Sequence, residues 1–192
     1  MRQSIVFAVS VCLVLTSEVA NAAVTYMTKN ECFQVTPISG STSYASYQSD
    51  FSTLQASSSF TQKMRVSKLK LCGTFLDFDG LQMFISDGAQ TIALGKFGRE
   101  SSCEEVVVPR GTWITKAELG YNSVGLNFFR ATTNQNVKIE RGQFRSTDKR
   151  YTEFFTEDEP LIGLVGYETS VLKALGFYRY KCATAIDPNE VV

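Results

Sequence analysis

The chain has 192 residues and carries 19 acidic and 19 basic side chains, so its formal net charge at pH 7 is zero. A balanced charge argues against nucleic acid or an anionic membrane surface as a partner. The chain contains no histidine, which excludes Ser-His-Asp and Cys-His catalysis, histidine-ligated metals and an imidazole pH switch.

Residues 1–22 have the pattern of a secretory signal peptide. Arg2 supplies a positive charge, residues 5–15 form an apolar run, and Ala20-Asn21-Ala22 has the small residues of a cleavage site. The apolar run is shorter than the roughly 20 residues that a bilayer span needs, and no later segment could span a membrane. We therefore expect a secreted protein without membrane insertion, whose mature chain begins at Ala23.

Four cysteines follow the signal peptide, which is an even number for an oxidising compartment: Cys32, Cys72, Cys103 and Cys182. They allow three pairings, and the sequence does not choose among them. We prefer Cys32 with Cys182 and Cys72 with Cys103, because the first pair would tie both ends of the domain. Zinc is the alternative use of four thiols, but the chain has no C-x-x-C spacing. We expect no metal ion and no other cofactor.

Residues 23–62 are rich in serine, threonine and tyrosine and show no sustained period of 2 or 3.6. This composition predicts a polar lead-in or an irregular cap rather than an independent domain. The open alternative is that aromatic side chains such as Phe51 and Phe60 pack on the main domain. Residues 183–192 are expected as a short C-terminal tail.

Residues 63–182 change to short segments of strand period without a helical period. One segment places three apolar side chains on alternate positions, namely Leu81, Met83 and Ile85. The next places five on one face: Trp113, Thr115, Ala117, Leu119 and Tyr121. Asp77-Phe78-Asp79-Gly80 resembles part of a calcium loop but lacks the other ligands, so we expect a hairpin turn there. The pattern predicts a single all-β domain, as a sandwich, barrel or prism.

Four segments carry a more specific resemblance. Residues 161–166 (LIGLVG) and 174–178 (ALGFY) are similar to the closing I-x-G-F-x-G and A-I-G-x-Y strands of the jacalin-like lectin family. Residues 113–119 (WITKAEL) and 126–134 (LNFFRATTN) resemble its Y-I-x-x-V-x-G strand and its L-x-F-x-T-N segment. The resemblance spans residues 63–182. It implies a β-prism, in which three four-stranded antiparallel sheets surround a pseudo-threefold axis.

The resemblance also implies a place for a binding site. Family members bind sugars at one end of the prism, where a glycine near the N-terminus meets a loop written G-x-x-x-D. The loop aspartate accepts hydrogen bonds from sugar hydroxyls. The candidate ligand-binding loop of this chain consists of Gly166, Thr169, Ser170, Val171 and Lys173.

This loop departs from the family pattern at two positions. Thr169 replaces the glycine, and Lys173 replaces the aspartate. A lysine ammonium only donates hydrogen bonds, so it cannot perform the aspartate's task. The N-terminal glycine also lacks a clear counterpart near Ser57-Ser58-Ser59. Lys173 is therefore expected to face an acidic glycan or a protein carboxylate, or to be an ordinary exposed lysine.

A basic cluster leaves two interpretations open. It contains Arg141, Arg145, Lys149 and Arg150, interleaved with aromatic residues. Such a cluster is typical of a surface that binds sulfated polymers, and equally of a solvated loop balanced by nearby acidic residues.

The sequence thus predicts a secreted, non-catalytic, lectin-like protein whose partners are glycans or glycoproteins, with acidic ones preferred. The alternative is a structural or protein-interaction protein of an extracellular matrix, surface or secretory granule that kept the prism and lost sugar binding. A homo-oligomer is compatible with both. An enzyme is not expected, because the only dense acidic run, Glu157-Asp158-Glu159, has the pattern of a solvated turn.

Overall fold

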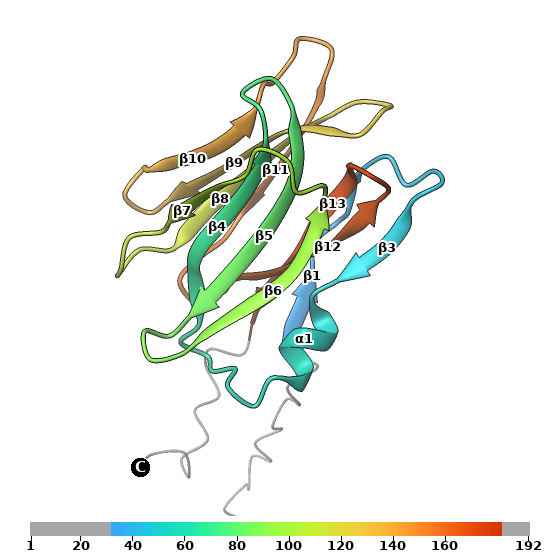
Figure 1. The fold of residues 1–192 in the computed structure, drawn as a ribbon. Coiled ribbons are helices and arrows are strands. Elements are labelled where there is room, and N and C mark those ends of the chain that lie inside the picture. Colours follow the sequence, from blue (N-terminus) through green and yellow to red (C-terminus); the bar gives the residue numbers. More distant parts are fainter. Residues whose placement is uncertain (1–31, 182–192) are drawn as a thin grey trace, which may run out of the picture.

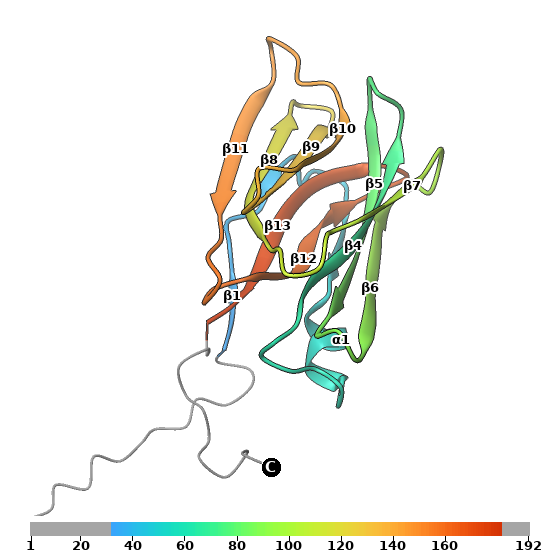
Figure 2. The same ribbon diagram turned by 90° about the vertical axis from the view of Figure 1, so that its left-hand side faces the viewer.

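The computed structural model of the chain describes residues 32–181. This range contains thirteen β-strands and one short helix, Phe51–Ala56 (α1). The strands form three antiparallel sheets, whose arrangement the two views in Figure 1 and Figure 2 show. The sheets surround a shared apolar core. The predicted β-prism is confirmed. The expected signal peptide and C-terminal tail lie outside the described residues.

The first sheet joins the two ends of the described range. Its strand order is β1-β13-β12-β3, and β2 also pairs with β13. Because β1 and β2 lie along the same edge of β13, the sheet has four strand positions, one of them filled by two short strands. The five strands are β1 (Phe33–Val35), β2 (Ser39–Gly40), β3 (Ser46–Ser49), β12 (Leu161–Glu168) and β13 (Leu172–Tyr180).

The other two sheets have four strands each. The second sheet has the order β6-β5-β4-β7 and the third has the order β10-β9-β8-β11. The second consists of β4 (Arg65–Gly73), β5 (Phe78–Ser86), β6 (Thr91–Gly98) and β7 (Glu104–Val107). The third consists of β8 (Ile114–Tyr121), β9 (Leu126–Thr133), β10 (Lys138–Gly142) and β11 (Lys149–Phe154).

Alternate side chains of the strands fill the core. Leu81, Met83 and Ile85 of β5 are each at most 2% exposed, which confirms the predicted alternation. Full burial of such a side chain stabilises the fold by about 1.5–3 kcal/mol. Between sheets, the stacked rings of Phe78 and Phe129 lie 5.5 Å apart. The prism is therefore held mainly by apolar contacts between its three inner faces.

One strand differs from its predicted pattern. In β8, Ile114 pairs with Thr133 and Lys116 pairs with Thr132, so Thr115 is the extra residue of a β-bulge. Ile114 is 2% exposed and lies in the core, whereas Trp113 is only half-buried. The prediction that Trp113 and Thr115 share the buried face was wrong, because one extra residue reverses which side chains point inward.

The hairpin turn predicted at Asp77-Phe78-Asp79-Gly80 lies earlier in the chain, since Phe78, Asp79 and Gly80 are inside β5. The hairpin turn is at residues 74–77, where the Thr74 hydroxyl accepts hydrogen bonds from the N–H groups of Leu76 and Asp77. Gly80 serves a different purpose. A Cβ at this position would lie 2.7 Å from the carbonyl oxygen of Phe97, so glycine permits close approach of neighbouring strands.

The segment expected as a polar lead-in contributes three strands and α1 to the prism from residue 33 onward. Its aromatic side chains pack on the main domain, as the alternative supposed. The ring of Phe33 lies 5.8 Å from that of Phe51, 5.3 Å from that of Phe60 and 5.6 Å from that of Tyr180. Strands of two to four residues are too short to show a period in the sequence.

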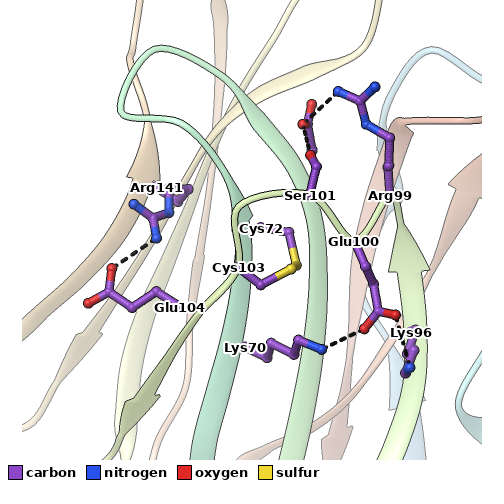
Figure 3. The surroundings of a disulfide bond; sticks show 10 residues. Lys70, Cys72, Lys96, Arg99, Glu100, Ser101, Cys103, Glu104 and Arg141 are labelled. Atoms are coloured by element: carbon purple, nitrogen blue, oxygen red, sulfur yellow. Dashed lines mark hydrogen bonds and ion pairs between the residues drawn. A yellow bond between two sulfur atoms is a disulfide. The ribbon is translucent and has the colours of Figure 1, made fainter.

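A disulfide joins Cys72, near the end of β4, to Cys103 in the connection between β6 and β7 (Figure 3). This confirms one of the two preferred pairings. Cys32 is also disulfide-bonded, and its expected partner Cys182 lies outside the described residues. Within residues 32–181, no helix has the length and apolarity that a membrane crossing requires.

A buried carboxyl group connects the first and second sheets. Asp50 is 0% exposed. Its Oδ1 accepts a hydrogen bond of 2.7 Å from the N–H of Gly95 in β6, and its Oδ2 accepts one of 2.8 Å from the N–H of Leu164 in β12. Burial raises the pKa of Asp50 to about 7, although the two N–H groups act in the opposite direction.

Candidate functional site

Six connections gather at one end of the prism, which we call the loop end. They join β2 to β3, β4 to β5, β6 to β7, β8 to β9, β10 to β11, and β12 to β13, and they lie in the upper part of Figure 1. The termini of the described range lie at the other end. The candidate ligand-binding loop is therefore close to several other loops.

The structure places the residues of this loop along a tight turn. Gly166 lies within β12, where a Cβ would be 2.2 Å from the carbonyl oxygen of Ala174, so its role is close strand packing. The turn itself is closed by a hydrogen bond of 3.0 Å from the N–H of Thr169 to the carbonyl oxygen of Val171. Thr169 and Ser170 are exposed to solvent. Their hydroxyl groups are accessible to a ligand at the loop end.

Lys173 reaches across to the neighbouring sheet. Its ammonium donates a hydrogen bond of 2.5 Å to the carbonyl oxygen of Val124, in the connection between β8 and β9. Within residues 32–181 it forms no ion pair with a carboxylate. Its charge therefore lies between two loops without a counter-charge.

A glycine near the N-terminus does meet this loop, and it is Gly40. Gly40 has a φ of 132°, and a Cβ there would lie 2.3 Å from the carbonyl oxygen of Lys173. The N–H of Ser41 donates a hydrogen bond of 3.0 Å to the same oxygen. The sequence analysis sought a counterpart of the family's N-terminal glycine near Ser57-Ser58-Ser59 and therefore missed Gly40. The available signal was that Gly40 is the single glycine in residues 23–62.

A pocket of about 310 Å³ opens beside this loop. Val171 of the candidate loop lines one side, and the connection between β8 and β9 contributes Val124 and Gly125. The polar side chains of its lining are Thr74, Asp77, Asp79, Arg99, Asn122, Asn127 and Arg145. Its volume lies at the lower end of the range of roughly 300–1,000 Å³ that is usual for small-molecule sites.

The charges of this pocket are paired. Arg145 contacts Asp77 at 2.7 Å, and Arg99 contacts Asp79 at 2.9 Å. Asp79 also accepts a hydrogen bond of 2.7 Å from the Ser101 hydroxyl. Burial alone would raise the pKa of Asp79, but the bonds from Ser101 and Arg99 outweigh it and hold this pKa below its usual value. The pocket therefore presents fixed donors and acceptors without net charge, which suits hydroxyl-rich ligands.

Asp148 holds two walls of the pocket together. Its Oδ1 accepts a hydrogen bond of 2.8 Å from the Asn127 amide. Its Oδ2 accepts one of 2.6 Å from the N–H of Arg145. Asn127 belongs to β9 and Arg145 to the connection between β10 and β11. The pocket is thus preorganised by a network that links neighbouring strands and loops.

Three cations of the basic cluster interact with different partners. Arg141 pairs with Glu104 at 2.9 Å (Figure 3), and Arg145 pairs with Asp77. The guanidinium of Arg150 lies 4.2 Å from the ring centroid of Phe144. These cations have separate partners, which favours the interpretation as a balanced surface over a polymer-binding patch.

The acidic run forms a turn at the end of the prism opposite the loop end. Glu159 donates its N–H to the Thr156 hydroxyl at 3.0 Å, and its carboxylate lies 3.5 Å from Arg179 and 3.8 Å from Lys181. In the part of the chain that the structure describes, no three histidine, cysteine, aspartate or glutamate residues cluster as a metal site. The carboxylate of Glu159 is therefore engaged in surface ion pairs.

No protein-family model matches the chain, and no curated protein matches its sequence. Solved structures do match. A mannose-specific jacalin-related lectin from Morus nigra, in complex with mannose, has a TM-score of 0.60 at 11% identity, over 81% of this chain and 99% of that lectin. The mannose-binding lectin from champedak has a TM-score of 0.59 at 12% identity, over 76% of this chain and 95% of that lectin. The mannose-binding jacalin-related lectin from Ananas comosus has a TM-score of 0.58 at 14% identity, over 77% of this chain and 97% of that lectin. This likeness establishes the fold of jacalin-related lectins.

Proposed function

We propose that the protein is a secreted, non-catalytic carbohydrate-binding protein that recognises glycans at the loop end of the prism. The observation that carries this proposal is the preorganised polar pocket of about 310 Å³ beside the candidate loop. Its paired carboxylates and guanidinium groups can accept and donate hydrogen bonds to sugar hydroxyls. The fold supports the proposal, since the structures that share it are those of mannose-binding lectins.

We further propose that the site favours glycans with an acidic group. Lys173 stands where the family motif has an aspartate, and its ammonium lies at the connection between β8 and β9 that also lines the pocket. One N–H of the Lys173 ammonium donates to the carbonyl oxygen of Val124, and the other two N–H groups can donate to a ligand. A carboxylate or sulfate at this place would supply the missing counter-charge.

The substitution Lys173→Ala tests this preference with 3′-sialyllactose and lactose as probes. We expect the wild-type protein to bind sialyllactose more tightly than lactose, and Lys173→Ala to weaken sialyllactose binding by about fivefold, as suits an exposed charge pair. The preference should also shrink with added salt, because the Debye length is about 10 Å at 0.1 M ionic strength. Isothermal titration calorimetry measures both effects.

Lys173→Arg is the conservative control and should keep the preference for sialyllactose. The reverse design, Lys173→Asp with Thr169→Gly, should give measurable affinity for mannose, because it restores the acceptor and the flexible turn. Equal affinities for the two probes in wild type and in Lys173→Ala, insensitive to salt, would contradict the acidic preference.

A second candidate function, recognition of a protein partner, rests on the apolar side chains that the loop end exposes. They are Tyr44 at 103%, Phe75 at 76%, Leu76 at 43% and Val124 at 69% exposure. Tyr44 has a φ of 57°, an uncommon backbone conformation for a residue with a side chain. Exposed apolar groups of this kind mark interaction surfaces. A glycan array that shows no binding to any neutral or acidic glycan would favour this function over sugar recognition.

Secretion can be tested on the covalent structure of the exported protein. We expect its mass to correspond to a chain that begins at Ala23, with all four remaining cysteines oxidised. Intact mass spectrometry after thiol alkylation, with and without reduction, measures both properties. Retention of residues 1–22, or a free thiol in the native protein, would contradict the expectation.

A further inference from the structure

A second and larger pocket, of about 650 Å³, lies at the end of the prism opposite the loop end. The turn from β5 to β6 and the connection from β7 to β8 form two of its walls, and the start of β4 forms another. These turns are in the lower part of Figure 1. The pocket is about twice the volume of the one at the loop end. We call it the terminal pocket.

The only tryptophan of the chain, Trp113, lines the terminal pocket. The β-bulge at Thr115 takes Trp113 off the inner face of β8, where a regular strand would have placed it. Two hydrogen bonds then fix its backbone. Its N–H donates to Asn134 Oδ1 at 3.3 Å, and its carbonyl oxygen accepts from the Asn134 N–H at 3.0 Å. A large aromatic side chain is thus held at a pocket instead of in the core.

Arg65 places a fixed positive charge in the same pocket. Its Nη1 donates to the carbonyl oxygens of Gln62 and Met64, both at 2.9 Å, and its Nη2 donates to that of Glu157 at 2.8 Å. These partners are all main-chain carbonyl groups. The guanidinium is therefore positioned by neutral hydrogen-bond acceptors, while the carboxylates of Glu157 and Asp158 are near enough to interact with its charge.

Two further cations line the pocket, Lys63 and Arg110, and both are exposed. Neither forms an ion pair with a described residue. The lining also includes two acidic residues, Asp87 and Glu157. Asp87 is engaged in its own turn, where it accepts hydrogen bonds from the N–H groups of Ala89 and Gln90. Three cations face two carboxylates, so the pocket has a positive balance.

We propose that the terminal pocket is a second carbohydrate-binding site, for an anionic saccharide unit that carries a sulfate or a carboxylate. The indole of Trp113 offers an apolar face of the kind that packs on a sugar ring while its N–H remains a donor. Arg65, Lys63 and Arg110 supply the donors that recognise sulfate or carboxylate oxygens. The hydroxyl groups of Ser67 and Thr91 also line the pocket. The volume lies within the usual range of roughly 300–1,000 Å³ for ligand sites.

This site is separate from the loop end, so its test is independent of the function proposed above. Trp113 is the only tryptophan, and its fluorescence reports directly on the terminal pocket. We expect a saturable fluorescence change when the mature protein is titrated with a sulfated heparin disaccharide, and none with cellobiose at the same concentrations. The double variant Lys63→Ala, Arg110→Ala should bind the heparin disaccharide at least about tenfold more weakly, because it lacks two charge-assisted hydrogen bonds.

A matched control removes the same amount of charge from the third sheet. The double variant Lys138→Ala, Lys149→Ala alters two exposed lysines outside the pocket and should keep the wild-type fluorescence titration. Lys173→Ala should keep it as well. The proposal is wrong if heparin disaccharide leaves the fluorescence unchanged, or if both double variants lose affinity equally. It is also wrong if Lys173→Ala abolishes the titration, since the disaccharide would then bind at the loop end.

Discussion

The free energy of unfolding should decrease by up to about 4 kcal/mol between about pH 4 and pH 7, because the unfolded chain releases the Asp50 proton in this range while the folded protein still holds it. The carboxyl group is 0% exposed and has no cation among its hydrogen-bond partners, which are the N–H groups of Gly95 and Leu164. Burial without a counter-charge disfavours the ionised form. The folded state therefore binds this proton more tightly than the unfolded chain does.

The sign follows from the two pKa values of Asp50. Its ordinary value is 3.8, and burial in the folded protein raises it to about 7. Below pH 4 the carboxyl is protonated in both states, so the stabilisation from the buried neutral form is fully present. As the pH rises towards 7, the unfolded chain ionises freely and the folded protein does not, so this stabilisation is lost. Above pH 7 the contribution of Asp50 no longer changes.

Chemical denaturation at pH 4, 5.5 and 7 measures this effect as a difference between wild type and Asp50→Asn. The asparagine does not titrate, so the variant should lack the part of the slope that Asp50 causes. Asp87→Asn is the matched control. The pKa of Asp87 is lowered, mainly by hydrogen bonds from Gln90 and Ala89, so its contribution has the opposite sign. An unchanged slope in Asp50→Asn would show that the buried carboxyl does not cause the pH dependence.

The sequence correctly predicted those strands whose local hydrophobic pattern agrees with the position of the same residues in the structure. Leu81, Met83 and Ile85 alternate in the sequence and lie in the core, and the two closing strands fall where residues 161–166 and 174–178 resemble the lectin family. Each of these segments is eight or nine residues long in the structure. Strands of this length show the period of 2 clearly.

The remaining errors have identifiable physical causes. The bulge at Thr115 inserts one residue into β8, and no local signal in the sequence announced it. The strands β1 to β3 are stabilised by partners more than 100 residues away, such as Tyr180 for Phe33, so their own sequence carries little information. Gly40 belongs to this segment. Its relation to Lys173 depends on the pairing of β2 with β13, which is a tertiary contact.

The candidate site was predictable only as a loop. The sequence located Thr169 and Lys173, but the pocket beside them is built largely from other parts of the chain: Asp77 and Arg145 come from two other connections, and Asp79 comes from β5. From the local sequence, Asp77 and Asp79 were interpreted as part of a hairpin turn. The ion-pair partners of their carboxylates, Arg145 and Arg99, lie far along the chain, so the sequence did not reveal these pairs. Arg145 is 68 residues from Asp77. Only the folded chain shows that they form one polar pocket.

Removal of the disulfide between Cys72 and Cys103 should lower the free energy of unfolding by about 3–4 kcal/mol. The bond closes a sequence separation of 31 residues, and a cross-link of this span restricts the unfolded chain considerably. The double variant Cys72→Ala, Cys103→Ser removes the bond without leaving a free thiol at either position. Urea denaturation at neutral pH measures the change.

The same variant should weaken glycan binding at the loop end, because the connection that holds Cys103 also carries Arg99 and Ser101 (Figure 3). Both of these side chains donate hydrogen bonds to Asp79. Without the cross-link this connection is less constrained, so the acceptor position of Asp79 is less well defined. Glu100→Gln is the control in the same connection. It weakens the exposed ion pairs with Lys70 and Lys96 and keeps the disulfide, so it should change stability and binding far less. If Glu100→Gln destabilised the protein as much as loss of the disulfide, the surface ion pairs rather than the cross-link would be what holds this connection in place.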